Sequence, residues 1–417
     1  MKKQKRESRK KICVLGLGYI GLPTACYFAQ AGFRVVGVDI DSKKLHNLKK
    51  GILPFQEHGL SELFLKARKN MEFSSLCVPA DVFIIAVPTP LTKDKKCELS
   101  YVIRASEMIT SVLENGNVIV LESTVSPRCC ADILKPIFDK AKKKYFLAHC
   151  PERAIPGSTL YEMVHDDRVV GGIDRESTKR TVALYNSFVK GDIHETDATT
   201  AEVVKVAENT YRDVNIALAN ELALISENFD INAWEVIKLA NLHPRVNIHL
   251  PGPGVGGHCI PIDPWYLTEK YPQSKIVKTA RILNDSMPAY VVDRVQEEVR
   301  TVGPLNNVGI LGVAYKKNVD DSRESPAEYI WELLQKQGYA VKAADPFVKN
   351  FSHELDSEKE VLSLADAVIL VTDHDAYKKI DFSKYPNIKL VFDTRNLYQG
   401  KIKGKGRLIT LGVSNQI

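Results

Sequence analysis

The sequence lacks any apolar run long enough to cross a membrane as a helix. Its longest apolar segments, such as Val-Phe-Ile-Ile-Ala-Val at 82–87, have the length of a β-strand, whereas a membrane-spanning helix needs roughly 18 apolar residues. The basic N-terminus is followed by a short apolar run that leads straight into a glycine-rich turn, without the cleavage site of a signal peptide. We therefore expect neither a membrane partner nor a secretory leader.

Cysteine is scarce, and it is not arranged for metal binding or cross-linking. The chain has 8 cysteines in 417 residues and no Cys-x-x-Cys pair. A disulfide framework is typical of short secreted chains, and zinc sites usually contain closely spaced cysteine pairs. The sequence therefore predicts no metal site and mostly buried thiols in a reducing cytoplasm.

Most of the chain also lacks a net basic charge. The formal net charge is +6, but residues 1–11 hold seven basic side chains and one acidic one, and residues 12–417 hold fifty of each sign. A nucleic-acid-binding domain usually carries a basic face, so we expect no nucleic-acid partner. A segment as polar as 1–11 cannot bury enough apolar surface to fold, and a disordered tail is expected there.

What the chain does contain is an alternation of short apolar runs and longer amphipathic ones. Strands are expected at 12–17, 34–40, 82–87, 118–122, 145–149 and 169–173, and again at 308–311, 339–344, 367–372 and 390–393. Amphipathic runs at 20–31 and 326–337, each followed by glycine, predict helices. Strands that alternate with helices form βαβ units and parallel sheets.

The middle of the chain differs, because the 52 residues between Gly191 and Pro244 contain neither glycine nor proline. Thr199 and Glu202 have the spacing of a helix-capping box, and the helical pattern continues from there to about residue 230. A helix of this length extends over roughly 45 Å, which is enough to join two domains.

These patterns predict an α/β fold with two Rossmann-like doubly wound domains, joined by a central helical region with a long connecting helix. The N-terminal domain is expected over residues 12–190, the central helical domain over 191–304 and the C-terminal domain over 305–417. The C-terminal half offers only Gly309-x-x-Gly312 without a third glycine, so a second dinucleotide is not expected there.

The first expected strand leads into Gly16-Leu17-Gly18-Tyr19-Ile20-Gly21, which opens the first expected helix. Its glycines allow a tight turn and a close approach of the backbone to a pyrophosphate at the helix N-terminus. Asp39 ends the next expected strand, where a carboxylate can accept a hydrogen bond from a ribose 2′-hydroxyl. The same carboxylate would repel a 2′-phosphate, which favours NAD over NADP. Lys44 nearby weakens that preference.

Residues 251–259 are the most unusual segment, Pro-Gly-Pro-Gly-Val-Gly-Gly-His-Cys. Four glycines in six residues favour a loop whose backbone amides can approach a ligand. Cys259 at its end is placed like a nucleophile or an acyl carrier, and Asp263 follows it. A small buried thiol after a turn is the structural alternative for this cysteine.

The long helix carries Lys205, Asn209 and Arg212, whose spacing places them on one helical face. A polar stripe is often a solvated face. Here the flanking residues are apolar, which indicates an enclosed helix. Lys205 could then serve as a base or stabilise an oxyanion.

Several further motifs occur in the order seen in UDP-glucose/GDP-mannose dehydrogenases. With the segments 16–23 and 256–261, they are Val87-Pro88-Thr89-Pro90, Glu122-Ser123-Thr124, Pro151-Glu152, Glu208-Asn209-Thr210-Tyr211 and Ser322-Arg323-Glu324-Ser325-Pro326. On these motifs the chain resembles that family over nearly its whole length after the first eleven residues. The resemblance implies an NAD-dependent oxidoreductase that converts the C6 hydroxymethyl group of a nucleotide sugar into a carboxylate, with two NAD reduced per turnover. It also implies a homodimer or a higher homo-oligomer formed through the central domain, and a C-terminal domain that binds the UDP-sugar.

The resemblance also assigns catalytic roles. Cys259 resembles the nucleophile that captures the aldehyde as a thiohemiacetal, which a second oxidation turns into a thioester. A further set resembles the groups that handle the C6 oxygen, its protons and the attacking water: Lys205, Asn209 and Asp263 for the oxygen and protons, Glu152 as the base, and Thr124 to place the water or the nicotinamide.

Two sets of binding residues follow from the same resemblance. The NAD contacts are Gly16, Gly18, Tyr19, Ile20, Gly21, Asp39, Lys44, Thr89, Thr124 and Arg323. The nucleotide-sugar contacts are Arg153, Ala154, Lys205, Asn209, Arg212, His243, Arg245, Gly256, Tyr315, Lys316 and Arg395, of which Arg245 reaches across a dimer in the family.

Departures from the glucose-type pattern indicate the substrate branch. Glucose-type members usually have Pro-Glu-Phe and Cys-x-Pro-Lys-Asp, whereas here Arg153 follows Glu152 and Ile262 replaces the lysine. The missing lysine removes one NAD contact of the family. These substitutions resemble the branch that oxidises UDP-N-acetylhexosamines, and UDP-N-acetyl-D-mannosamine is the expected substrate. UDP-N-acetyl-D-glucosamine is the alternative, and UDP-glucose is a more distant one.

Two other classes of function are alternatives to this expectation. A two-electron β-hydroxyacid dehydrogenase would explain Lys205 and Asn209 but would leave Cys259 and the third domain without a role. The other alternative is a non-enzymatic protein that senses NAD or binds nucleic acid through the basic tail, and deletion of residues 2–11 would then abolish binding.

Overall fold

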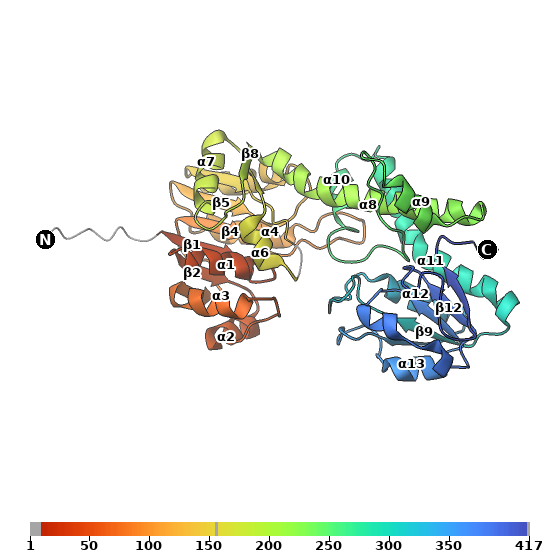
Figure 1. Cartoon of the computed structure of the whole chain (residues 1–417). Coiled ribbons are helices and arrows are strands. Elements are labelled where there is room, and N and C mark those ends of the chain that lie inside the picture. The colour runs from red at the N-terminus through yellow and green to blue at the C-terminus, as the bar shows by residue number, and fades with distance from the viewer. Residues whose placement is uncertain (1–9, 155–156, 415–417) are drawn as a thin grey trace. The chain divides into compact units, whose positions relative to one another are not determined.

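The computed structural model describes residues 10–154 and 157–414 of the chain (Figure 1). They form two compact units. The N-terminal unit runs to Glu208 and includes Trp265–Lys270, and the C-terminal unit comprises Asn209–Pro264 and the residues from Tyr271 onward. Residues 1–9 of the expected tail lie outside the described residues, and Lys11 already belongs to the first strand. The three domain boundaries stay a prediction.

The N-terminal unit is built on an eight-stranded sheet with the order β3-β2-β1-β4-β5-β6-β7-β8. Its strands are β1 (Lys11–Leu15), β2 (Arg34–Val38), β3 (Met71–Ser74), β4 (Val82–Ile85), β5 (Asn117–Leu121), β6 (Tyr145–His149), β7 (Arg168–Gly172) and β8 (Ile193–Asp197). Neighbouring strands are parallel, except that β6 and β7 are antiparallel.

Helices cover both faces of this sheet. They are α1 (Gly21–Gln30), α2 (Ser42–Lys50), α3 (Leu60–Ala67), α4 (Ser100–Thr110), α5 (Lys135–Asp139), α6 (Thr159–His165) and α7 (Arg175–Tyr185), with the short turns η1 (Arg68–Asn70) and η2 (Cys130–Leu134). Alternate residues of a strand point to opposite faces. In β1, Ile12 and Val14 pack into one apolar core, and Cys13 and Leu15 pack into another. Burial on both sides explains why the strands are continuous apolar runs.

The long helix α8 (Ala198–Asn228) has 31 residues, close to the expected length. Its first turn is capped by Asp197, whose carboxylate accepts from the Thr200 backbone N–H at 3.0 Å. The expected capping box of Thr199 and Glu202 is wrong, because the Glu202 carboxylate instead accepts from the backbone N–H groups of Arg128 and Cys130 at 2.5 and 2.8 Å.

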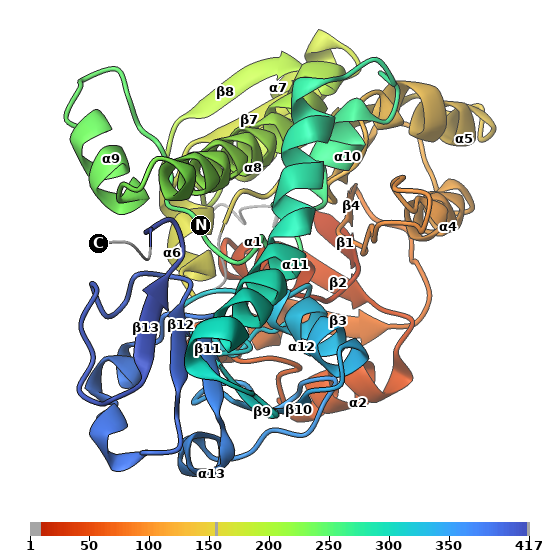
Figure 2. The same cartoon turned by 90° about the vertical axis from the view of Figure 1, so that its right-hand side faces the viewer.

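The C-terminal unit contains a second parallel sheet with the order β10-β9-β11-β12-β13 (Figure 2). Its strands are β9 (Asn307–Leu311), β10 (Ala340–Ala344), β11 (Ala367–Leu370), β12 (Leu390–Asp393) and β13 (Arg407–Thr410). The helices that follow α8 are α9 (Ala233–Ala240), α10 (Asp263–Thr268), α11 (Ile276–Val302), α12 (Pro326–Lys336) and α13 (Glu358–Leu364), with the turns η3 (Asp375–Lys379) and η4 (Phe382–Lys384). The expected α/β class with two Rossmann-like sheets and a long helix is confirmed.

The second sheet is also buried on both faces. Val308 and Ile310 of β9 pack into a core with α11 and α12, and Leu311 packs into another with α13. The turn after β9 contains Gly312 at φ +85°, where an added Cβ would lie 2.5 Å from the Cβ of Thr372. Gly312 therefore serves the close packing of β9 against the segment after β11.

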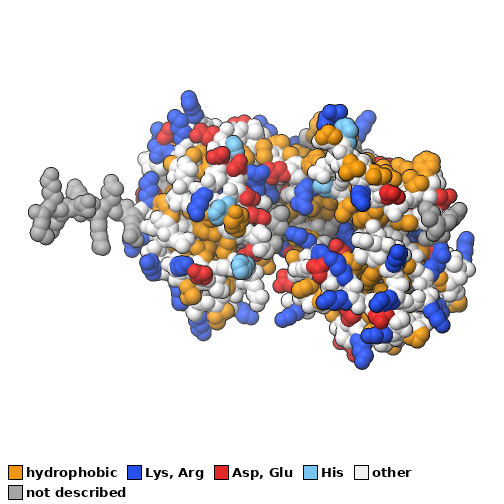
Figure 3. Space-filling model, viewed as in Figure 1, with side chains coloured by type: hydrophobic (Ala, Val, Ile, Leu, Met, Phe, Trp, Pro, Cys, Tyr) orange, Lys and Arg blue, Asp and Glu red, His pale blue; other side chains and the backbone are white. Residues whose placement is uncertain are grey.

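The surface carries charges of both signs. On the face shown in Figure 3, basic and acidic side chains are interspersed over each unit. Among residues 10–154 and 157–414, no helix is both long and apolar enough to cross a membrane.

Candidate functional site

The turn between β1 and α1 is shaped by its glycines. Gly16 has φ +95°, and a Cβ added to it would lie 2.5 Å from the Ala86 carbonyl oxygen. A Cβ on Gly21 would lie 1.9 Å from the Gly16 carbonyl oxygen, whereas one on Gly18 would meet nothing within 4 Å. Gly16 and Gly21 thus allow the turn itself, and Gly18 leaves open space at the start of α1, as a pyrophosphate requires.

Asp39 follows β2 and faces this turn. Its Oδ2 accepts from the Leu17 backbone N–H at 3.0 Å and from Lys44 Nζ at 2.7 Å, and its Oδ1 accepts from the Asp41 backbone N–H at 3.0 Å. The carboxylate is therefore fixed at the carboxyl end of the sheet, where a ribose would lie. These residues fit a dinucleotide, and Lys44 pairs with Asp39.

The other expected NAD contacts divide between the two units. Tyr19 is exposed and stacks on Phe55 with ring centroids 4.2 Å apart, and Ile20 directly precedes α1. In the same unit, the Thr89 hydroxyl donates to the Thr124 carbonyl oxygen at 2.7 Å. The fifth, Arg323, belongs to the C-terminal unit and pairs with Asp321 at 2.6 Å.

Glu152, the expected base, lies in a loop after β6 and is nearly buried. Its Oε1 accepts from the backbone N–H groups of Arg153 and Ala154 at 2.7 and 2.9 Å. Its Oε2 accepts from Arg168 Nη2 at 2.7 Å. Arg168 is not among the residues predicted from the sequence. The available signal was a charged residue directly before the apolar run expected at 169–173.

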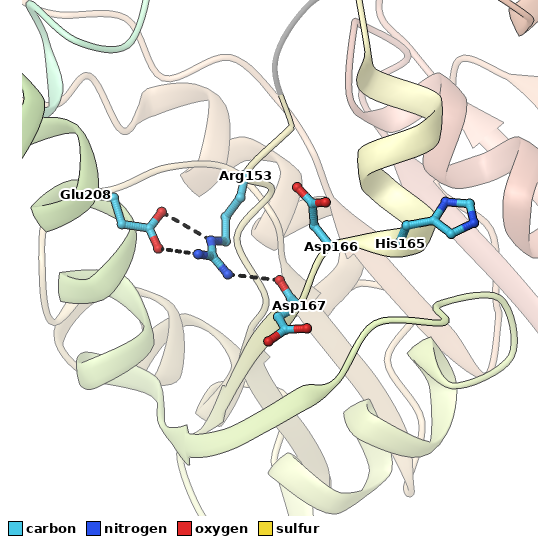
Figure 4. A pocket seen from close by; sticks show the side chains of 5 residues that line it. All are labelled: Arg153, His165, Asp166, Asp167 and Glu208. Atoms are coloured by element: carbon cyan, nitrogen blue, oxygen red, sulfur yellow. Dashed lines mark hydrogen bonds and ion pairs between the residues drawn. The ribbon is translucent and has the colours of Figure 1, made fainter.

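Arg153 lines a pocket of about 410 Å³ together with Glu208 and the segment 165–167 (Figure 4). Its Nε and Nη2 bind the Glu208 carboxylate at 3.2 and 2.8 Å, and its Nη1 donates to the Asp167 carbonyl oxygen at 2.9 Å. Figure 4 shows the guanidinium between Glu208 and Asp167, with the His165 ring pointing away. Glu208 was not predicted from the sequence as the partner of Arg153.

Lys205 is 8% exposed, yet the residues that the structure describes offer its ammonium group no hydrogen bond or ion pair. A buried cation without a partner is costly, and such a group is suited to an oxygen of a ligand. His149, at the end of β6, is also buried in this unit, and burial lowers its pKa to about 3. The imidazole is therefore neutral at ordinary pH.

Cys259 ends the glycine-rich loop in the C-terminal unit and is exposed. Of the other seven cysteines, all described, six are buried and Cys77 is half-buried. Burial raises the pKa of the Cys150 thiol to about 12, so Cys150 remains a protonated thiol. The structural alternative of a buried thiol therefore fits Cys150 and does not fit Cys259.

The loop before Cys259 packs closely on the second sheet. A Cβ on Gly256 would lie 2.6 Å from the Glu324 carbonyl oxygen, and one on Gly257 would lie 3.0 Å from the Tyr315 ring. A Cβ on Gly252 would lie 2.3 Å from Arg395 Nη1. Tyr315 and Arg395 both follow strands at the carboxyl edge of that sheet, the usual place for ligands in such folds.

Asn209 and Asp263 meet in the C-terminal unit. Asn209 Nδ2 donates to Asp263 Oδ2 at 2.6 Å, and both side chains are buried. The Asp263 backbone N–H donates to the Cys259 carbonyl oxygen at 2.9 Å, which ties this pair to the loop. Four further expected sugar-nucleotide contacts are exposed side chains of the same unit, namely Arg212, His243, Arg245 and Lys316.

No cluster of His, Cys, Asp and Glu side chains that could hold a metal ion occurs among the described residues. The segment 165–167, in which a histidine and two aspartates are adjacent, therefore forms no such cluster.

Comparisons with known proteins identify relatives over nearly the whole chain. Residues 10–189, 199–286 and 309–400 match the NAD binding, central and UDP binding domains of the UDP-glucose/GDP-mannose dehydrogenase family. The UDP-N-acetyl-D-mannosamine dehydrogenase of Methanocaldococcus jannaschii is 47% identical over 95% of this chain and 94% of its own. The solved structure of a UDP-D-ManNAc dehydrogenase from Pyrococcus horikoshii is 36% identical, with a TM-score of 0.91 and coverage of 96% of this chain and 99% of that chain. That of a UDP-N-acetyl-mannosamine dehydrogenase from S. aureus is 42% identical, with a TM-score of 0.88 and coverage of 96% and 98%.

Proposed function

Because the chain belongs to the UDP-glucose/GDP-mannose dehydrogenase family, we propose that it oxidises C6 of UDP-N-acetyl-D-mannosamine to a carboxylate, giving UDP-N-acetyl-D-mannosaminuronate. It is an NAD-dependent dehydrogenase that acts on a nucleotide sugar. The mannosamine assignment is carried by one observation, the near full-length likeness to relatives of that name. The matched UDP binding domain occupies the part of the chain that a two-electron β-hydroxyacid dehydrogenase would leave without a role.

NAD would be held by the glycine turn and by Asp39, and when bound it accepts the hydride that leaves C6 in each of two oxidations. Gly18 provides the open space for the pyrophosphate, and the fixed Asp39 carboxylate accepts from the ribose hydroxyl. Further proposed contacts are Tyr19, Ile20, Lys44, Thr89, Thr124 and Arg323.

The Cys259 thiol adds to the aldehyde carbon that the first oxidation produces, and a C–S bond forms. The second hydride leaves from that carbon and converts the thiohemiacetal into a thioester. Water then attacks the carbonyl, the C–S bond breaks and the sulfur regains a proton. One alcohol, two NAD⁺ and one water thus give one carboxylate, two NADH and three protons. The exposure of Cys259 at the end of a glycine loop supports this role.

Lys205, Asn209 and Asp263 act on the C6 oxygen. The unpartnered ammonium group of Lys205 is suited to stabilise developing negative charge on that oxygen. The short hydrogen bond from Asn209 to Asp263 fixes both side chains, so the amide and the carboxylate have defined directions toward the oxygen and its protons.

Glu152 removes the proton of the water that attacks the thioester, and Thr124 helps to place that water. Three donors fix the Glu152 carboxylate, and an immobile carboxylate is what general-base catalysis needs. The proposed sugar-nucleotide contacts are Arg153, Ala154, Lys205, Asn209, Arg212, His243, Arg245, Gly256, Tyr315, Lys316 and Arg395. Arg153 contacts the sugar either while it remains paired with Glu208 or in place of that pair.

A homodimer or a higher homo-oligomer in the cytoplasm completes the proposal. Leu218 and Ile225 of α8, Leu239 of α9 and the adjacent Leu242 are all at least 44% exposed. Large apolar side chains that are exposed on helices favour an interface between subunits. Eight cysteines without a disulfide fit a reducing compartment.

The substrate is tested by comparing kcat/KM for UDP-N-acetylmannosamine, UDP-N-acetylglucosamine and UDP-glucose at saturating NAD. We expect the mannosamine substrate to be preferred by about tenfold or more, which corresponds to roughly 1.4 kcal/mol in the transition state. A preference for the glucosamine epimer, the runner-up, would contradict the substrate assignment and leave the dehydrogenase chemistry intact.

A further inference from the structure

Arg168 is a fully buried cation that no proposed step yet uses. It is the first residue of β7, and its side chain is 4% exposed. Its Nη2 donates to Glu152 Oε2 at 2.7 Å and to the Met163 carbonyl oxygen at 3.3 Å, and its Nη1 lies 3.8 Å from Cys150 Sγ. The Glu152 carboxylate is therefore the only side-chain anion that Arg168 contacts among the described residues.

Two aromatic rings hold the Arg168 guanidinium in place. Its central carbon lies 5.0 Å from the ring centroid of Tyr185 at the end of α7, and 5.8 Å from that of Phe188. Cation–π contacts of this kind are strongest when water is excluded. Arg168 is thus fixed from the helix layer, independently of the loop that carries Glu152.

The second buried carboxylate nearby does not compete for Arg168 by hydrogen bonding. Glu122 follows β5, and its oxygens accept from the hydroxyl groups of Tyr185 and Thr24 at 2.5 and 3.0 Å. The other titratable groups that interact with Glu152 in this unit include Tyr27 of α1, Cys150 and Glu122, and none of these three carries a positive charge. The guanidinium of the adjacent Arg153 binds Glu208 and the Asp167 carbonyl oxygen instead. Among the described residues, Arg168 is thus the cation whose side chain contacts the Glu152 carboxylate.

We propose that Arg168 is a positioning residue for the hydrolysis step, in which its rigid guanidinium keeps the Glu152 carboxylate oriented toward the attacking water. This inference rests on the proposed role of Glu152. It implies that loss of the guanidinium fork slows the release of the acid from Cys259 more than it slows the two oxidations. A residue with a merely structural role would lower the amount of folded enzyme without changing which step limits turnover.

The test measures how much of the enzyme carries an acyl group on Cys259 during turnover, by acid quenching and intact mass, together with kcat and KM. In Arg168→Met we expect kcat to fall about 100-fold with most of the enzyme acylated, because a misplaced base costs about that factor. Arg168→Lys keeps the charge and loses the fork, so a fall of about tenfold with partial acylation is expected. KM for the sugar should fall together with kcat, so that kcat/KM stays within about twofold, because slower release of the acid leaves the steps up to the acyl-enzyme unchanged.

Two variants make the outcome decisive. Glu152→Gln should accumulate the same acyl-enzyme. Arg180→Met is the matched control, because Arg180 of α7 also pairs with a glutamate and lies 4.0 Å from the Phe146 ring, but it does not touch Glu152. It should turn over like the wild type.

The possible failures can be told apart. If Glu152→Gln accumulates acyl-enzyme and both Arg168 variants do not, the positioning role is wrong and the proposed function stands. If Glu152→Gln hydrolyses the acyl group at the wild-type rate, the proposed role of Glu152 is wrong, and the proposed role of Arg168 is then wrong as well. If Arg168→Met does not fold, the acylated fraction in Arg168→Lys decides the question alone.

Discussion

The carboxyl group of Glu122 shows how burial alone can make stability depend on pH. The residue is buried between the Tyr185 and Thr24 hydroxyls, and burial raises its pKa from 4.5 to about 7. The folded chain thus keeps this proton up to about pH 7, whereas the unfolded chain loses it near pH 4.5. The resulting stabilisation is complete below pH 4.5 and is lost as the pH rises through 7.

Replacing Glu122 by glutamine should remove this pH dependence, because the amide is neutral throughout and can still form two hydrogen bonds. We expect the midpoint of thermal unfolding of Glu122→Gln to match that of the wild type near pH 5. At pH 8 it should be roughly 2–8 °C higher, as expected for about 1–3 kcal/mol in a unit of this size. Thermal unfolding at pH 5, 6, 7 and 8 measures the difference.

Glu176→Gln is the control for this series, since Glu176 forms only an exposed pair with Arg180 on α7. Its difference from the wild type should be small and constant with pH. A Glu122→Gln difference that is equally constant would mean that the buried group is ionised in the folded chain at all these pH values.

At the residue scale, the sequence predicts the residues that a backbone conformation requires. It does not predict which charged side chains pair with one another. Gly16 and Gly21 could be placed because the turn after a first strand needs them. The partner of Arg153 lies 55 residues away on α8, and that of Arg168 lies in the loop after the neighbouring strand. Which side chains meet there depends on the register of β6 and β7 and on the position of α8, which local patterns do not encode.

The turn from β1 into α1 is the element on which cofactor binding depends most directly. Gly21 and Gly18 differ in what an added methyl group would meet, namely the Gly16 carbonyl at 1.9 Å in one case and open space in the other. The two positions therefore separate the stability of the element from its affinity for the dinucleotide.

Gly18→Ala should leave the midpoint of thermal unfolding unchanged and weaken NAD binding by about tenfold or more, because the methyl group fills space reserved for the pyrophosphate. Gly21→Ala should lower the midpoint of thermal unfolding and also weaken NAD binding, because the backbone clash costs about 2–4 kcal/mol of folding free energy. Thermal unfolding with and without NAD, and titration with NAD, test the pair. Equal NAD affinity in Gly18→Ala and the wild type would place the pyrophosphate elsewhere.

The strands that could be predicted from the sequence are mainly those buried on both faces of a sheet. The strands expected at 145–149 and 390–393 have those bounds in β6 and β12, and the other expected strands differ by one or two residues at one or both ends. The strands β3, β8 and β13 were not predicted from the sequence. All three are edge strands and carry polar residues, such as Ile-His-Glu-Thr-Asp in β8. A half-exposed strand loses the continuous apolar pattern by which a buried parallel strand is recognised.

At the scale of the whole molecule, the proposed chemistry uses both units. The N-terminal unit contributes the dinucleotide turn, Glu152 and Lys205, and the C-terminal unit contributes Asn209, Cys259 and Asp263. A dehydrogenase that stops at the aldehyde needs no thiol, whereas oxidation to a carboxylate needs a covalent carrier and a base for water. The four-electron stoichiometry therefore distinguishes the proposed reaction from an oxidation that stops at the aldehyde.

The most direct test is the yield of NADH at completion with limiting UDP-N-acetylmannosamine and excess NAD, with the product identified by mass. We expect two NADH per sugar and a product that carries a C6 carboxylate. One NADH per sugar, with an aldehyde or a ketone as product, would contradict the proposed reaction, because neither Cys259 as an acyl carrier nor Glu152 as the base for water would then have a step to perform.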